Sequence, residues 1–230
     1  MSQLNAWNEH PDPETWEYHT KQWNEPYRST VKFEEFIKEK LDASELVIDA
    51  GCGSGAPTHY LAESHPTTKF TGIEISRELL GFTKTRDNLE FERDDLTNLK
   101  VRFGVDGVVL IQVLSWLPGY ENALHQIATR IRPHWIAFST LIWPGDIDCN
   151  IVVKEHKRPR ESFHNIYGLP GLMRFMTAEG YPIGQYKPFN IDIEIPQEGT
   201  DHMKSYTSDG ELFSGPLFLP WAFVMFERAG

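Results

Sequence analysis

One short segment, residues 47–55 with the sequence VIDAGCGSG, constrains the fold more than any other part of the chain. Its apolar run ends in Asp49, and three glycines follow at alternate positions, Gly51, Gly53 and Gly55. The next residues, 56–63, are typical of a helix. A buried strand that turns sharply into a helix gathers unpaired N–H groups and the positive end of the helix dipole at one place, and glycine lets a ligand lie against the backbone. The segment therefore predicts a nucleotide-type ligand site in an α/β sheet.

Two kinds of cofactor fit such a turn. Gly51, Gly53 and Ala56 match the dinucleotide fingerprint G-x-G-x-x-A, which keeps an NAD-dependent oxidoreductase open as an alternative. Asp49 helps to separate the two, because an acid two residues before the first glycine suits a ligand with an ammonium group and repels a pyrophosphate. The acid therefore favours the ammonium-bearing ligand.

The same run resembles motif I of the class I S-adenosylmethionine (SAM)-dependent methyltransferases. The resemblance implies a doubly wound α/β fold with a mostly parallel seven-stranded sheet, Rossmann-like, that ends in an antiparallel C-terminal strand pair. It implies SAM as the cofactor and methyl transfer to a small-molecule acceptor as the activity. A non-catalytic SAM-binding protein is a further alternative. The residues that the resemblance places at the methionine end of the cofactor are Asp49, Ala50, Gly51, Cys52, Gly53 and Gly55.

Acids also end the next two expected strands. Residues 69–74 form a strand that ends in Glu74, roughly 20 residues after Gly51, which is the spacing of a ribose-binding acid. By resemblance, Glu74 binds the ribose and Ile75 contacts the adenine ring. A third strand, residues 89–92, precedes two acids. The resemblance assigns the adenine amino group to Asp95, with Asp94 a close second and Leu96 beside them.

The near-continuous apolar run of residues 107–114 is typical of a central parallel strand, and its end brings Gln112 close to the methyl that is transferred. We expect one domain over residues 1–230 with a SAM-binding core at 45–142. The N-terminal segment 1–44 is predicted to be helical, packed on the flank or covering the site as a lid. The other expected elements are helices at 31–41, 77–82, 121–132 and 169–179 and strands at 135–142, 189–195 and 217–227.

The acceptor side is less well defined by the sequence. Segments 143–167 and 196–215 are expected to be substrate-side loops, and the first contains a basic cluster at 154–160. That cluster is either a solvated surface or a site for a phosphate or carboxylate group. The expected acceptor is a sugar or a phosphorylated or carboxylated metabolite, with a sugar or phosphorylated acceptor first. Position alone makes His156, His164 and Tyr167 candidates for a general base.

Charge and composition limit the partners. The net charge of −11 opposes binding to nucleic acid. The two cysteines are far apart, no His/Cys spacing suggests a metal site, and no apolar run is long enough to span a bilayer. These features predict a cytoplasmic enzyme without a metal and without a membrane partner.

Overall fold

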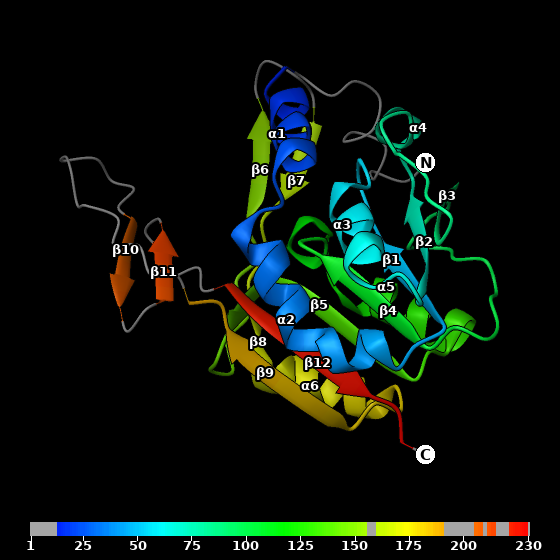
Figure 1. Ribbon diagram of the computed structural model, residues 1–230. Helices are drawn as coiled ribbons and strands as arrows, with labels where there is room; N and C mark the ends of the chain where they lie inside the picture. The colour runs from blue at the N-terminus through cyan, green and yellow to red at the C-terminus, as the bar shows by residue number, and fades with distance from the viewer. Residues whose placement is uncertain (1–12, 156–159, 191–204, 209–210, 215–220, 230) are drawn as a thin grey trace.

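A mixed β-sheet with a predominantly parallel half forms the centre of the molecule (Figure 1). The computed structural model describes residues 13–155, 160–190, 205–208, 211–214 and 221–229. The strand order along the sheet is β3-β2-β1-β4-β5-β12-β9, and the short β8 pairs with the end of β5. The strands are β1 (Leu46–Ala50), β2 (Lys69–Glu74), β3 (Leu89–Arg93), β4 (Gly107–Ile111), β5 (Trp135–Trp143), β8 (Tyr167–Gly168), β9 (Ile183–Pro188) and β12 (Trp221–Glu227).

The strand order reverses beside β1. The chain runs outward from β1 to β2 and β3, and then returns to place β4 and β5 on the other side, with all of these pairs parallel. β12 is antiparallel to both of its neighbours, β5 and β9. Ligands of doubly wound sheets bind at the carboxyl ends of the strands where the order reverses. The fold thus places the glycine turn that follows β1 at this point.

Helices cover both faces of the sheet. Successive residues of a strand point to opposite faces, so neighbouring residues pack against different helices. Val47 and Phe70 pack with residues of α2 and α3 in one cluster, whereas Ile48 and Ile73 belong to the cluster that contains residues of α5 and α6. The helices are α1 (Pro13–Asn24), α2 (Arg28–Asp42), α3 (Ala56–Ser64), α4 (Arg77–Leu80), α5 (Glu121–Gln126), which continues as a π-helical turn η3 (Ile127–Ile131), and α6 (Leu169–Ala178).

Elements outside the sheet gather at its carboxyl edge. Figure 1 shows α1 and the hairpin of β6 (Val152–Glu155) and β7 (Arg160–Phe163) at the same end of the molecule. The 3-10 turn η2 (Leu114–Trp116) follows β4 at this edge. A second hairpin pairs β10 (Ser205–Ser208) with β11 (Glu211–Ser214). Within the described ranges, no helix is both long enough and apolar enough to cross a bilayer.

The predicted fold class is confirmed, and the differences lie at strand ends. β4 ends at Ile111, three residues before the predicted end, because Gln112 adopts a left-handed conformation. The partner of β12 is β9 at residues 183–188, which the sequence interpretation missed. The strand predicted at 189–195 lies mostly in residues outside the described part of the chain, as do residues 217–220 of the predicted last strand.

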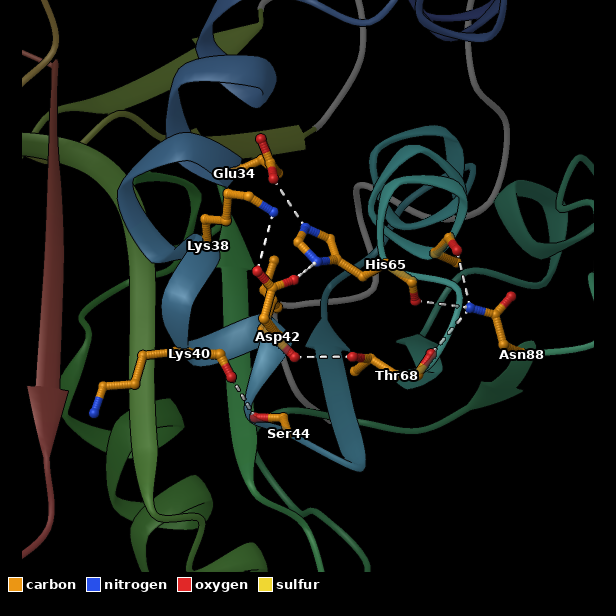
Figure 2. A network of polar contacts seen from close by, with 10 residues as sticks. Glu34, Lys38, Lys40, Asp42, Ser44, His65, Thr68 and Asn88 are labelled. Atoms are coloured by element: carbon orange, nitrogen blue, oxygen red, sulfur yellow. Dashed lines mark hydrogen bonds and ion pairs between the residues drawn. The ribbon is translucent and has the colours of Figure 1, made fainter.

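A buried histidine fixes α2 against the loop between α3 and β2 (Figure 2). The His65 side chain, 1% exposed, contacts Glu34 Oε1 through Nε2 at 2.9 Å and Asp42 Oδ1 through Nδ1 at 2.7 Å. Asn88 extends the network by donating to the carbonyl oxygens of Ala62, His65 and Thr68. Because α2 also contacts β4 and β12, this network helps to position α2 on the sheet.

Gly72, in the middle of β2, has no room for a side chain. A Cβ atom at this position would lie 2.9 Å from Cys52 Sγ and even closer to the ring of Phe91. We expect Gly72→Ala to lower the free energy of unfolding by about 2 kcal/mol through overpacking, measured by urea denaturation. The matched control is Gly171→Ala in α6, where the nearest atom is 3.8 Å away; it should be neutral or slightly stabilising.

The double variant Gly72→Ala with Phe91→Leu tests the cause of this effect. If overpacking against the Phe91 ring is responsible, the loss in the double variant is smaller than the sum of the two single losses. Additive losses would contradict the explanation.

Candidate functional site

Asp49 lies near the end of β1 and is buried, with 1% of its surface exposed. Its Oδ2 accepts a hydrogen bond from Thr58 Oγ1 of α3 at 2.6 Å. Its Oδ1 is buried and has no hydrogen-bond partner among the described residues. Burial raises the pKa of Asp49 to about 7; the hydrogen bond from Thr58 opposes the increase and the nearby Glu74 carboxylate adds to it. An acceptor atom is therefore available for a cationic donor.

The turn after β1 uses its three glycines as the sequence predicts. Gly51, Gly53 and Gly55 have φ values of 82°, 57° and 79°, a region that residues with a Cβ rarely adopt. A Cβ at Gly51 would also lie 2.8 Å from Val113, and one at Gly55 would lie 2.6 Å from the ring of Phe91. The backbone at these three glycines is thus free of side chains next to Asp49.

The remaining residues predicted around the turn are part of its support. Ala50 is fully buried in the core, and Cys52 is buried behind the turn at 5% exposure. Ile73 O accepts hydrogen bonds from Gly51 N at 2.8 Å and from Cys52 N at 3.0 Å. Since Ile73 directly precedes Glu74, these bonds hold the turn against the end of β2.

Glu74 points toward the same turn. Its Oε2 accepts from Gly53 N at 3.0 Å, and its Oε1 accepts from Ile75 N at 2.8 Å and Ser76 N at 2.9 Å. Burial raises the pKa of Glu74 against the effect of these three bonds. A carboxylate has about four lone-pair positions, so an acceptor position is left for a hydroxyl group. The structure thus brings the predicted ribose-binding acid and the glycine turn together.

The two acids after β3 have different surroundings. Asp94 Oδ2 forms an ion pair with Arg102 at 2.6 Å, and its Oδ1 accepts from Asp95 N, so its carboxylate stabilises the loop. Asp95 Oδ1 accepts from the N–H and the hydroxyl of Thr97, both at 2.8 Å. Leu96, between them and Thr97, packs against the core. Of the two acids, Asp95 is the better candidate for a ligand contact.

The end of β4 is held in an uncommon conformation. Gln112 has φ 59°, and its N–H bonds both the carbonyl and the hydroxyl oxygen of Ser139 on β5, each at 3.0 Å. Its side-chain Nε2 donates to Ser29 Oγ of α2 at 3.2 Å. Such conformations cost free energy and concentrate at functional sites. Gln112 lies directly after β4, at the strand end where the sequence places it, and it connects this end to α2.

Helix α1 covers the glycine turn. A Cβ at Gly53 would lie 3.5 Å from His19 of α1. Further along α1, Trp23 makes an edge-to-face contact with His59 of α3, with ring centroids 5.2 Å apart, and Lys84 Nζ lies 4.3 Å from the centre of the Trp23 ring. A shallow surface depression lies where α1, α2 and α3 meet, lined by Gln22, Pro26, Tyr27, Thr30, Ala56 and Pro57.

The three residues predicted as candidates for a general base lie in different surroundings. His156 lies outside the described residues. His164 follows β7 and contacts Trp116 of η2, with ring centroids 5.1 Å apart, and burial lowers its pKa. Tyr167 is 2% exposed, its hydroxyl donates to Leu114 O at 2.9 Å, and burial raises its pKa to about 12. These features make Tyr167 a structural residue and a poor base.

Asn165 is a residue of this edge that the sequence interpretation missed. It is fully buried; its Nδ2 donates to Leu117 O at 2.8 Å, and its Oδ1 accepts from Ile151 N at 3.0 Å. It therefore fixes the loop that carries Trp116 to the segment that carries His164. Thr58, Ser29 and Arg102 were missed as well. No group of three or more His, Cys, Asp or Glu in the described part of the chain is arranged to bind a metal ion.

Comparison with known proteins finds similarity in the central segment of the chain. Residues 47–134 match the family described as "Methyltransferase domain". Among curated proteins, the trans-aconitate 2-methyltransferase of Azoarcus sp. is 30% identical over 40% of this chain and 37% of its own length. The chain spans less than half the length of the first curated relatives that it matches.

Solved structures confirm the fold. A putative S-adenosylmethionine-dependent methyltransferase from Listeria monocytogenes is 14% identical with a TM-score of 0.58, and the match covers 87% of this chain and 99% of that one. Human N-acetylserotonin methyltransferase, in complex with SAM, is 14% identical with a TM-score of 0.57 over 90% of this chain and 53% of that one. The predicted family, enzyme class and cofactor agree with these comparisons.

Proposed function

We propose that this chain, whose residues 47–134 belong to the methyltransferase-domain family, binds SAM at the carboxyl edge of its sheet and transfers the methyl group to a small-molecule acceptor. The observation that carries the proposal is a buried acid, Asp49, whose Oδ1 is an open acceptor beside the glycine turn. In the same turn the N–H of Gly53 donates a hydrogen bond to Glu74. This arrangement suits a ligand with an ammonium group and ribose hydroxyls. A pyrophosphate would meet two buried carboxylates, which disfavours NAD.

The proposed contacts follow the order of the strands. Asp49 and the backbone at Gly51 and Gly53 hold the methionine end, while Glu74 binds the ribose. At the base, Ile75 and Leu96 contact the ring and Asp95 accepts from its amino group. Gln112 and the turn after β4 lie beside the transferred methyl. When bound, the cofactor supplies an activated methyl group, so the chain mainly has to orient the acceptor and exclude water.

We place the acceptor between Trp116 of η2 and His164, which lies in the proposed substrate-side segment 143–167. Trp116 is 39% exposed and offers a flat apolar contact at the edge of the site. Because burial lowers its pKa, His164 is neutral at neutral pH and is able to accept a proton from a hydroxyl or amine acceptor. The second proposed substrate-side segment, 196–215, is described only at residues 205–208 and 211–214.

Carboxylic acids are the first acceptors to test. The name of the Azoarcus sp. relative specifies a carboxylate substrate, trans-aconitate, for that protein. A carboxylate is already anionic and needs no base, whereas a hydroxyl acceptor does. The net charge of −11 further favours a small molecule over a nucleic acid.

The experiment is transfer of label from methyl-labelled SAM to separate panels of carboxylic acids, sugars, phosphorylated metabolites and amines. Label in a product supports the proposal. His164→Ala separates the acceptor classes: it should preserve the rate for a carboxylate and reduce it about 100-fold for a hydroxyl. Absence of transfer to every panel, combined with tight binding of S-adenosylhomocysteine (SAH), would instead favour a non-catalytic SAM-binding protein.

We also propose that α1 acts as a lid over the cofactor. Its contacts with the rest of the molecule include those of Trp23 with His59 and Lys84. Trp23→Ala removes an aromatic contact and a cation–π contact, together worth about 1–2 kcal/mol, and we expect SAH to dissociate about tenfold faster. Stopped-flow fluorescence measures this rate.

The matched control for the lid is Phe103→Ala. Phe103 is also a large aromatic residue but is 87% exposed, in the loop before β4. Its loss should leave the dissociation rate unchanged. Equal rates for wild type and Trp23→Ala would remove α1 as a lid.

A further inference from the structure

The carboxylate of Asp49 is buried without a compensating cation. One oxygen has only the neutral hydroxyl of Thr58 as its donor, at 2.6 Å, and the other has no hydrogen-bond partner in the part of the chain that the structure describes. No described ion pair includes Asp49. A buried charge without a partner is unfavourable, so such a group either takes up a proton or requires a cation.

The elements packed around Asp49 supply no positive charge to it. Within the sheet, its register partners are Gly72 on β2 and Val109 on β4. Its titratable neighbours are both acidic. Besides burial, the charge of Glu74, at the end of β2, raises the pKa of Asp49, and Asp49 in turn raises the pKa of the Cys52 thiol in the turn.

The covering helices do not change this balance. From α3 the contact is the hydroxyl of Thr58. His59, also on α3, and His19 of α1, which lies over Gly53, both have pKa values lowered by burial and are neutral at neutral pH. The groups that could neutralise Asp49 are thus a proton or a bound cation.

We propose that Asp49 exchanges its proton for the ammonium group of the cofactor, so that cofactor binding at this site is coupled to the release of one proton to solvent. The inference rests on the proposed function. Below about pH 7 the carboxyl group of the free protein holds the proton. As the ammonium group binds beside Oδ1, the O–H bond breaks, the proton passes to solvent, and the carboxylate accepts a hydrogen bond from the ammonium instead.

The coupling has a defined sign. Burial raises the pKa of Asp49 to about 7 in the free protein, whereas pairing with an ammonium group lowers it. Below that pH, the ligand must first displace a proton, so the affinity falls as the pH decreases. From about pH 7 to about pH 5.5, where the ligand's ammonium group stays charged, we expect the dissociation constant of SAH to rise about 15-fold.

The direct test is isothermal titration calorimetry of SAH binding in two buffers with different ionisation enthalpies. The dependence of the observed enthalpy on the buffer gives the number of protons released. We expect about 0.9 proton per site at about pH 6 and about 0.1 at about pH 8. Asp49→Asn should bind more weakly and release no proton.

Thr58→Val provides a second variant in case Asp49→Asn does not fold. It removes the hydrogen bond that favours the charged carboxylate, so proton release at about pH 8 should increase. Absence of proton release by the wild type at about pH 6, or equal release by Asp49→Asn, would overturn the inference. Failure of SAH to bind at every pH would instead overturn the proposed function.

Discussion

Replacing Glu74 with alanine is expected to weaken SAH binding by at least 100-fold. The carboxylate of Glu74 accepts hydrogen bonds from three backbone N–H groups, including that of Gly53 in the glycine turn. The variant loses both the proposed ribose acceptor and the bond that holds the turn. Two charge-assisted bonds are worth about 3 kcal/mol or more, which corresponds to at least about 100-fold in affinity. Isothermal titration calorimetry measures the change.

Two further variants identify the cause. Glu63→Ala, on α3, removes the same charge from a side chain that is 64% exposed, and it should leave the affinity unchanged. Glu74→Gln keeps the shape of the side chain and part of its acceptor capacity, so it should lose less than Glu74→Ala. An unchanged affinity for SAH in Glu74→Ala would remove Glu74 from the site.

The largest effect on stability is expected for His65→Leu. The variant leaves Glu34, whose side chain is 11% exposed, without the imidazole at 2.9 Å. Removing one partner of a buried polar pair leaves the other desolvated and unpaired, so we expect the free energy of unfolding to fall by about 3 kcal/mol. Denaturation with urea or heat, on the full chain, measures this loss.

The network in Figure 2 supplies the controls. Asp42, the other carboxylate partner of His65, has a side chain that is 52% exposed, so Asp42→Asn should lower the stability much less than His65→Leu does. The double variant Glu34→Leu with His65→Leu removes both buried partners and should regain part of the stability lost in His65→Leu. A loss below about 1 kcal/mol in His65→Leu would contradict the structural role of the network.

Much of the cofactor edge could be predicted because its signals are local in sequence. The three glycines need their left-handed backbone within one turn, and Asp49, Glu74 and Asp95 each lie at or near the end of a strand. Strands of a parallel sheet end at a common edge, so the spacing of these acids predicts that all three lie along that edge.

The missed residues depend on packing between distant segments. The bond from Thr58 to Asp49 requires the angle between β1 and α3, and the contact of Ser29 with Gln112 joins residues 83 positions apart. The ion pair between Asp94 and Arg102 distinguishes Asp94 from Asp95, and it forms only once the loop has folded. Neither the hydrophobic periodicity of the sequence nor its motifs predict these contacts.

The C-terminal strands illustrate a second limit. Residues 189–195 alternate between apolar and polar side chains, which favoured a strand there. β9, at Ile183–Pro188, lies at the edge of the sheet, and its residues alternate between exposed and half-buried. An edge strand needs little apolar surface on its exposed side, so its sequence gives a weak signal.

Thermal unfolding with SAH or NAD tests the central claim most directly. A ligand at about 100 times its dissociation constant that binds only the folded chain adds about 2.7 kcal/mol to the free energy of unfolding. We predict that SAH raises the unfolding temperature of the wild type and that NAD at the same concentration does not. A rise with NAD and none with SAH would contradict a SAM site at this edge and identify a dinucleotide site instead.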